Sequence, residues 1–311
     1  METIAIGVDI GGSHVSCAAC DMSEKKYLGE TLSESELDNQ GTAPEIISVW
    51  ARTILETLEK ISTKKITGIG FAMPGPFDYV EGIGLFKGNN RKYENLNGLN
   101  VPHALREKMN LPGKLPIRFI NDATAFALGE DWLGKAAGTR NSLSITLGTG
   151  FGSAFLSDHL PVVTGDRVPE MGCVWYLPFK NGSADDYFST RGLLNRYHEK
   201  TGKTLSGVKE LAALVHEDPF IQVLFSDFGT NLGAFLHPWI EKSGTEALVI
   251  GGNISNAFNL FGKSLKEYFA VQGVKIRIAV SGLKETASII GSALLADDRY
   301  YKKLLPVLAH M

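Results

Sequence analysis

The sequence predicts an α/β fold built as two similar lobes that face a cleft. Strand-like and helical runs alternate along most of the chain, which is typical of sheets covered by helices. A strand, a glycine turn and a second strand of small residues occur at residues 4–20 and again at residues 143–156. The chain has 311 residues, which is long for one compact core and suits two.

The first of these repeated units opens the chain. Ile4, Ile6 and Val8 alternate with smaller residues, as in a strand, and Gly11-Gly12 predicts a turn. Thr42-Ala43-Pro44 indicates a helix start, since proline fits the first helical turn. The same periodicities predict further strands at residues 15–20, 27–32, 65–72, 117–120, 143–147, 153–156, 247–250 and 276–280, and helices at 46–61, at 123–132, through most of 185–243 and at 285–296.

Composition excludes several classes of protein. The formal net charge is −3 and the 31 basic residues are scattered, so a nucleic-acid surface is not expected. No apolar run reaches the ~18–20 residues that cross a membrane, and the N-terminus lacks the features of a signal peptide. Three cysteines are too few for a disulfide framework. We therefore expect a cytoplasmic protein that binds neither membrane nor nucleic acid.

Two glycine turns have the residues of phosphate-binding loops. Glycines let the backbone approach a ligand, and the N–H groups of a tight turn can point at phosphate oxygens. In Asp9-Ile10-Gly11-Gly12-Ser13-His14, the Asp9 carboxylate is placed to hold Mg²⁺ through water, and Ser13 adds a hydroxyl. Gly148-Thr149-Gly150 repeats the pattern before a strand, whereas a dinucleotide fingerprint would precede a helix. An ordinary hairpin tip is the alternative for the first turn.

Two polar motifs follow buried strands. Asn121-Asp122 lies between a strand and a helix, where a carboxylate can accept the proton of an attacking hydroxyl. A helix cap is the alternative role for Asp122. Gly251-Gly252-Asn253 ends another strand, and ligands collect at strand ends in open α/β sheets. Its alternative is a plain strand-to-helix turn with Asn253 as the cap.

In this order, five motifs resemble those of the ROK family (repressors, open reading frames and sugar kinases). They are Asp9–Ser13, Gly68–Pro76, Asn121–Glu130, Leu147–Gly152 and Val249–Ser255. The resemblance runs nearly end to end and implies the two-lobed, ribonuclease H-like fold of the actin-like ATPases, with a mixed sheet flanked by helices in each lobe. The N-terminal lobe would take residues 1–120 plus 285–311, and the C-terminal lobe residues 121–284.

The resemblance also implies roles for individual residues. Asp122 would be the catalytic base, and the sugar would be bound by Asn90, Asn121, Asp122, Glu170 and Asp185. ATP and Mg²⁺ would be bound by the two glycine turns and the strand-end motif: Asp9, Gly11, Gly12, Ser13, His14, Gly148, Thr149, Gly150, Gly251, Gly252 and Asn253. A homodimer is implied as well.

The chain departs from the family pattern in two places. Family members commonly carry Glu-x-Gly-His followed by a cysteine-rich zinc site, whereas this chain has Glu170-Met171-Gly172-Cys173 and no later cysteine. A structural zinc needs about four nitrogen or sulfur ligands, so we predict no zinc and a loop held by other packing. His14 stands where family kinases often have Lys or Arg, so a titratable imidazole replaces a permanent cation.

Together these features predict a kinase that transfers a phosphoryl group from ATP to a hydroxyl of a hexose or amino sugar. Polyphosphate is an alternative donor, since some ROK-like glucokinases use it and also lack the cysteine-rich site. The alternative from another class of function is a sugar-binding sensor or regulator of the same fold, with weak catalysis or none. Direct DNA binding is not expected, because the first phosphate motif begins at Asp9 and leaves no room for the helix-turn-helix of ROK repressors.

Overall fold

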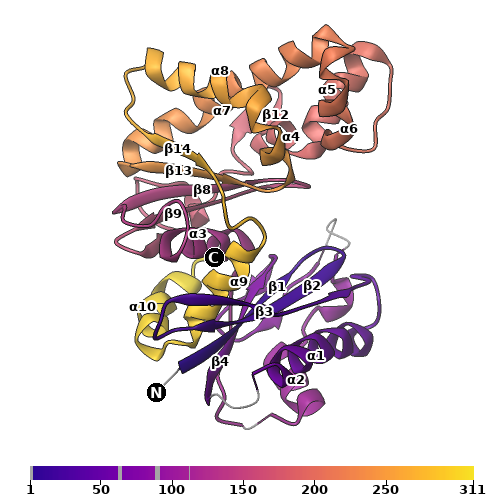
Figure 1. Cartoon of the computed structure of the whole chain (residues 1–311), viewed down its shortest axis with the longest axis vertical. Helices are drawn as coiled ribbons and strands as arrows, with labels where there is room; N and C mark the ends of the chain where they lie inside the picture. The colour runs from indigo at the N-terminus through magenta and orange to yellow at the C-terminus, as the bar shows by residue number, and fades with distance from the viewer. Residues whose placement is uncertain (1–2, 62–64, 88–91, 112) are drawn as a thin grey trace. The chain divides into compact units, whose positions relative to one another are not determined.

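A computed structural model describes residues 3–61, 65–87, 92–111 and 113–311 (Figure 1). The chain divides into two compact units. Unit 1 comprises Met1–Leu133 and Glu285–Met311, and unit 2 comprises Gly134–Lys284. Each unit contains a five-stranded mixed sheet with helices packed on it, so the predicted α/β class is confirmed.

The sheet of unit 1 has the strand order β3-β2-β1-β4-β7. β1 to β3 are antiparallel neighbours, and β4 and β7 run parallel to β1. Helices α1 and α2 lie on one side of this sheet and α9 and α10 on the other (Figure 1). The elements are β1 (Thr3–Ile10), β2 (His14–Asp21), β3 (Lys26–Glu36), α1 (Ala43–Glu59), β4 (Lys65–Met73), β5 (Phe77–Asp78), β6 (Ile83–Gly84), η1 (Glu94–Leu96), α2 (Val101–Met109), β7 (Ile117–Asn121), α3 (Asp122–Trp132), α9 (Thr286–Ala293), η5 (Leu294–Ala296) and α10 (Asp298–Leu308).

Unit 2 contains a sheet of the order β10-β9-β8-β13-β14, covered by the long helices α7 and α8. Its elements are β8 (Asn141–Leu147), β9 (Phe151–Ser157), β10 (Leu160–Val162), η2 (Glu170–Gly172), β11 (Pro178–Phe179), β12 (Gly182–Ser183), α4 (Ala184–Phe188), α5 (Thr190–Thr201), α6 (Val208–Ala213), η3 (Leu214–His216), α7 (Pro219–Ser243), β13 (Ala247–Gly251), η4 (Asn253–Ala257), α8 (Phe258–Val271) and β14 (Arg277–Val280).

The two sheets repeat one topology. Each begins with three antiparallel strands and adds two strands parallel to the first, β4 and β7 in unit 1 and β13 and β14 in unit 2. A glycine turn joins the corresponding strands, β1 to β2 and β8 to β9. The weak repeat in the sequence therefore marks a repeat of the structure.

One predicted strand is longer in the structure, and two helices, α2 and α10, were not predicted. β3 extends to Glu36, beyond the expected 27–32, and its added residues alternate between buried and exposed positions as an edge strand does. α10 follows the last predicted helix and was not expected. Asp297 caps it by accepting hydrogen bonds from the N–H groups of Arg299 and Tyr300, and Leu304 anchors it in the core.

Helix α9 packs against its neighbours through backbone rather than side chains. A Cβ on Gly70 of β4 would lie 1.8 Å from the carbonyl oxygen of Ser292, and a Cβ on Gly291 would lie 1.8 Å from that of Ala125 in α3. Only glycine permits such an approach. These contacts place α3 with unit 1, so the division of the chain falls after Leu133, whereas the expected boundary lay before residue 121.

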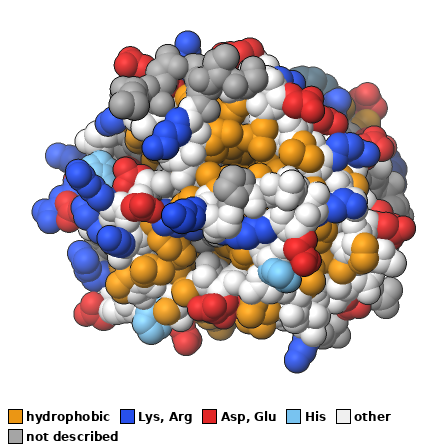
Figure 2. Space-filling view, turned by 90° about the horizontal axis from the view of Figure 1, so that it is seen from below, with side chains coloured by type: hydrophobic (Ala, Val, Ile, Leu, Met, Phe, Trp, Pro, Cys, Tyr) orange, Lys and Arg blue, Asp and Glu red, His pale blue; other side chains and the backbone are white. Residues whose placement is uncertain are grey.

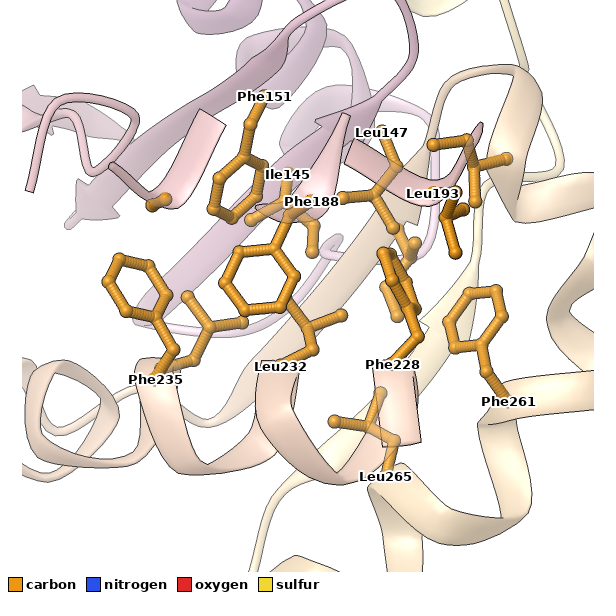
Figure 3. Packing of buried hydrophobic residues seen from close by; sticks show 14 of the residues in the cluster. Ile145, Leu147, Phe151, Phe188, Leu193, Phe228, Leu232, Phe235, Phe261 and Leu265 are labelled. Carbon is orange, nitrogen blue, oxygen red and sulfur yellow. The ribbon is translucent and has the colours of Figure 1, made fainter. Parts of the chain in front are cut away.

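The core of unit 2 is rich in aromatic side chains (Figure 3). Phe188 lies at its centre, with ring centroids 5.3 Å from Phe151, 5.6 Å from Phe228 and 5.3 Å from Phe235. Such tilted and edge-on pairs add to the stabilisation that burial provides. This cluster fixes the start of β9, directly after the second glycine turn.

The surface carries side chains of both charges. On the face shown in Figure 2, basic side chains gather on one side with acidic side chains among them, and apolar side chains are interspersed over the face. Among the described residues, no helix combines the length and the apolarity that crossing a membrane requires.

Candidate active site

Parallel strands bring the predicted acids of unit 1 to one edge of its sheet. Asp9 at the end of β1 pairs with Ala72 of β4, and the next residue of β4, Met73, pairs with Asn121 at the end of β7. Because β1, β4 and β7 run in the same direction, their carboxyl ends meet. Asp9, Asn121 and Asp122 therefore share one edge.

Asp122 is the first residue of α3, and one of its carboxylate oxygens is held in place. Oδ1 accepts hydrogen bonds from Asn121 Nδ2 at 2.9 Å and from the Ala123 N–H at 2.9 Å. Oδ2 accepts none from the described residues. Burial raises the pKa of the Asp122 carboxyl, whereas the Ala123 N–H, the Asn121 amide and the charge of Lys92 lower it. Oδ2 is thus available to take a proton.

The cap of α3 is Asn121, so the alternative interpretation of Asp122 as the cap is wrong. Asn121 Oδ1 accepts from the Thr124 N–H at 3.2 Å, while its Nδ2 donates to Asp122. One side chain thereby ends the strand, caps the helix and orients the neighbouring carboxylate. The predicted contact of Asn121 with a sugar stays a prediction.

Asp9 stands just before the first glycine turn in a crowded acidic environment. Burial, together with the negative charges of Asp122 and Glu285, raises the pKa of Asp9 to about 8. Carboxylates grouped in this way repel one another unless a cation lies between them. The role of Asp9 in holding Mg²⁺, which takes oxygen ligands, stays a prediction.

The carboxylates crowded around Asp9 predict how the stability of the protein depends on pH. The folded-state pKa of Asp9 is raised above its ordinary value of 3.8, so the folded protein binds more protons than the unfolded chain between about pH 4 and pH 8, and stability falls as pH rises through that window. We expect Asp9→Asn to raise the Tm of the metal-free protein by about 5 °C at pH 8 and by less at pH 5.

Thermal unfolding at both pH values, in chelator, measures this effect. Asp166→Asn, at an exposed position of unit 2, serves as the control and should show no such difference between the two pH values. An Asp9→Asn effect that does not grow with pH would contradict the crowding of charge around Asp9.

The first glycine turn is held from outside its own hairpin. The Asn39 amide donates to the Gly12 carbonyl, and the Tyr93 hydroxyl donates to the Gly11 carbonyl. The Gly11 N–H is bonded to the His14 carbonyl at 3.0 Å. The N–H groups of Gly12 and Ser13 have no acceptor among the described residues, so they are free to bind phosphate oxygens.

His14 opens β2 and is exposed. Its Nδ1 lies 3.2 Å from the Ser13 hydroxyl oxygen. Both residues border a cavity of about 930 Å³ whose wall is rich in carboxylates. The lining residues are Ser13, His14, Glu34, Ser35, Glu36, Leu37, Asp38 and Glu285. An extended polyanion would be repelled by this wall.

The second glycine turn, between β8 and β9, is held by the segment that carries α4 and α5. The Phe151 N–H donates to Asp185 Oδ1 at 2.7 Å, and the Thr190 N–H donates to the Gly148 carbonyl at 2.8 Å. The Phe151 ring points into the aromatic core beside Phe188 (Figure 3). The conformation of this turn is thereby held from two sides.

Asp185 contacts the second glycine turn directly. Besides the Phe151 N–H, its carboxylate contacts Arg191 at 3.1 Å, and a Cβ on Gly150 would lie 3.3 Å from its Oδ1. Through these contacts Asp185 positions the second glycine turn. The sugar-binding role predicted for Asp185 stays a prediction and gains no support from them.

The strand-end motif of unit 2 abuts the second turn. Gly252 follows β13 with φ +79°, and a Cβ there would lie 2.4 Å from the Leu147 carbonyl oxygen, next to Gly148. Gly252, rather than Asn253, precedes the short helix η4, so the alternative of Asn253 as its cap is wrong. Gly251, Gly252 and the Gly148 turn are therefore brought together.

Glu170 begins the exposed turn η2. Its side chain makes no contact with the second glycine turn among the described residues. Its carbonyl accepts from the Tyr176 hydroxyl at 3.2 Å, and the Trp175 carbonyl accepts from the Asp185 N–H at 2.9 Å. The loop is therefore tied to α4 by its backbone. The sugar-binding role of Glu170 stays a prediction.

Aromatic packing holds the segment in which family members carry zinc ligands. β11 and β12 form a short hairpin there, and Phe179 lies 5.0 Å from Tyr187 and 5.1 Å from Phe188, measured between ring centroids. In the part of the chain that the structure describes, no group of three or more His, Cys, Asp or Glu residues could hold a metal ion.

One predicted residue and one unpredicted residue lie close together in the chain. Asn90, the predicted sugar ligand, lies outside the described residues. Lys92 was not predicted, and a Cβ on Gly12 would lie only 3.3 Å from its Nζ. The signal in the sequence was a basic residue before an aromatic one, within a stretch rich in Gly and Asn that shows no periodicity.

The repeated sheets, each with a glycine turn between its first two strands, define the two-lobed actin-like ATPase class. A model of the ROK family matches residues 5–299. The chain belongs to the ROK family, as the motifs predicted.

Curated relatives match over nearly the whole chain. The glucokinase of Halalkalibacterium halodurans is 25% identical over 334 residues, covering 94% of this chain and 95% of that protein. The beta-glucoside kinase of Klebsiella pneumoniae is 28% identical over 303 residues, covering 94% of this chain and 95% of that protein.

Solved structures share the fold. The ROK hexokinase of Thermus thermophilus has a TM-score of 0.77 at 19% identity, covering 96% of this chain and 99% of that one. The Streptomyces griseus glucokinase, in complex with glucose and AMPPNP, has a TM-score of 0.72 at 20% identity, covering 94% and 98%. A ROK transcriptional regulator, a homologue of the E. coli MLC protein, has a TM-score of 0.76 at 17% identity, covering all of this chain and 82% of that one.

Proposed function

We propose that this protein is a sugar kinase that transfers the γ-phosphoryl group of ATP to a hydroxyl of a hexose or amino sugar. The observation that carries the proposal is the state of Asp122, with Oδ1 fixed by two hydrogen bonds and Oδ2 open, at the sheet edge that also bears the first glycine turn. The curated relatives named above are sugar kinases, which supports the same reaction.

In the proposed reaction, the sugar hydroxyl oxygen attacks the γ-phosphorus as the bond between that phosphorus and the bridging oxygen breaks. The hydroxyl proton passes to Oδ2 of Asp122, and ADP leaves with the electron pair of the broken bond. Catalysis in such transfers is mostly positioning and charge neutralisation. Asp9 would hold Mg²⁺, which when bound neutralises phosphate charge, and the N–H groups of Gly12 and Ser13 would bind phosphate oxygens.

ATP is the donor that we favour over polyphosphate. The strand-end motif at Gly251-Gly252 abuts the second turn through Leu147, at a position that suits the nucleoside part of a nucleotide. The carboxylate-lined cavity beside His14 would also repel a long polyanion.

A substrate panel tests the proposal. Wild-type protein is assayed with glucose, N-acetylated hexosamines, fructose, mannose and β-glucosides, with ATP and polyphosphate as separate donors. We expect sugar-dependent ADP formation with at least one sugar and at most a minor rate with polyphosphate. Sugar binding by calorimetry without turnover from either donor would overturn the proposal in favour of a sensor or regulator.

The proposal also covers the oligomeric state and the cellular location of the protein. We infer a homodimer, which sedimentation velocity would test. We also infer a cytoplasmic protein, in keeping with three cysteines that are all free thiols and with the burial of Cys17 and Cys20, which raises the pKa of each to about 12 and leaves both protonated.

A further inference from the structure

We propose that Lys92 is a catalytic residue whose ammonium group contacts the phosphoryl group during its transfer. The proposal rests on the proposed kinase reaction and adds a cation to it. Lys92 belongs to none of the motifs that predicted the site.

Lys92 lies over the first glycine turn. A Cβ on Gly12 would lie 3.3 Å from its Nζ and 3.5 Å from its Cε. The side chain is exposed, and it forms no ion pair with a described residue. Its ammonium group therefore sits where a phosphate bound by the Gly12 and Ser13 N–H groups would meet it.

The neighbouring residue, Tyr93, fixes Lys92 in this place. The Tyr93 ring is fully buried, with centroids 5.8 Å from both Trp50 and Phe86. Its N–H donates to the Asn39 carbonyl at 2.9 Å, and its hydroxyl donates to the Gly11 carbonyl. The same Asn39 donates its amide to the turn, so the backbone around Tyr93 is fastened to the glycine turn at several points.

Tyr93 adopts a backbone conformation that is uncommon for a bulky residue. Its φ is 60° and its ψ is 20°, in the left-handed region. Such a conformation persists only where the surroundings enforce it, and it occurs often at functional sites. Here it lets the aromatic ring enter the core while the preceding side chain, Lys92, stays over the turn.

The carboxylates at this sheet edge of unit 1 favour a cation at the position of Lys92. The negative charges of Asp122 and Glu285 raise the pKa of Asp9, and the charge of Lys92 lowers the pKa of Asp122. Lys92 thus lies close enough to Asp122 to lower its pKa, and its side chain lies against the first glycine turn. The group that must lie between the base and the turn during the reaction is the transferred phosphoryl. A Lys ammonium offers it a compact charge with three donors.

The kinetic test compares Lys92→Met, Lys92→Arg and the control Lys303→Met, which removes the same charge from an exposed position of α10. Loss of one donor aimed at developing charge typically costs 10²–10³ in rate, so we expect Lys92→Met to lower kcat by about 10²-fold. Lys92→Arg should keep at least a tenth of the rate, and Lys303→Met should match wild type. The acid limb of kcat/KM should move to higher pH in Lys92→Met, because the lost charge favoured the ionised form of Asp122.

A binding test works even if no sugar in the panel is phosphorylated. We expect Lys92→Met to weaken binding of the Mg²⁺ complex of AMPPNP by about 10-fold in calorimetry, and binding of the ADP complex by less than 2-fold, since only the former has a γ-phosphate. Equal effects on the two nucleotides, or none on either, would overturn the role of Lys92. An absence of sugar-dependent turnover in wild type, with this difference in binding present, would overturn the proposed function and leave the Lys92 contact standing.

Discussion

Asp122→Asn is expected to lower kcat by about 10³-fold while leaving the protein folded. The substitution keeps the side-chain oxygen that accepts from the Ala123 N–H, but it removes the carboxylate that takes the proton of the sugar hydroxyl. General bases contribute roughly 10²–10⁴ in rate. Because burial raises the pKa of Asp122, the ionised form costs stability in the folded state, so the Asn variant should be at least as stable as wild type at pH 7.

Asp298→Asn is the matched control, because Asp298 is also an acid at the first position of a helix in unit 1. Its carboxylate accepts from Arg118 at an exposed site, and no role in catalysis is expected for it. Steady-state kinetics and thermal unfolding of both variants separate loss of chemistry from loss of folding. If Asp122→Asn keeps more than a tenth of the wild-type kcat, Asp122 is not the base.

Gly291→Ala is expected to destabilise the protein by about 3 kcal/mol or more. Its Cβ would lie 1.8 Å from the Ala125 carbonyl oxygen, a backbone atom that can move only if the helices α3 and α9 separate. Overpacking of a tight core costs roughly 1–3 kcal/mol when side chains can adjust, and here the obstacle is backbone. Separation would also disturb the start of α3, where Asp122 lies, so activity should fall with stability.

Denaturant unfolding measures this effect, with Gly113→Ala as the control. A Cβ on Gly113 would meet no atom within 4 Å, so that variant should unfold within about 0.5 kcal/mol of wild type. If Gly291→Ala and Gly113→Ala unfold at the same denaturant concentration, then α3 and α9 do not pack as closely as the structure shows.

The sequence allowed much of this fold to be predicted because its main features are local. A glycine turn after an alternating strand is visible within ten residues, and its recurrence at residue 148 predicted the repeated sheet. The start of α1 was also predicted correctly, because Pro44 lies in its first turn, and the structure adds a capping pair of Thr42 and Glu45.

The features that were missed depend on contacts between distant segments. Nothing within the stretch around Lys92 shows that Tyr93 donates a hydrogen bond to Gly11, across more than eighty residues of sequence. The assignment of α3 to unit 1 likewise depends on its backbone contact with Gly291. The choice between Asn121 and Asp122 as the cap is local, but two adjacent residues with capping side chains satisfy the same pattern, and only the geometry at the end of β7 separates them.

The return of Glu285–Met311 to unit 1 has a consequence for how the protein is made. Unit 2 is one continuous segment and can fold as soon as it leaves the ribosome, whereas β1, β4 and α3 must wait for α9, which is translated after it. We expect a chain truncated after residue 284 and released from the ribosome to present a protease-resistant unit 2 and a protease-sensitive N-terminal segment, as limited proteolysis would show. The edge that bears Asp9 and Asp122 would then be completed last, so a partly synthesised chain would hold its catalytic carboxylates without the scaffold that makes them act together.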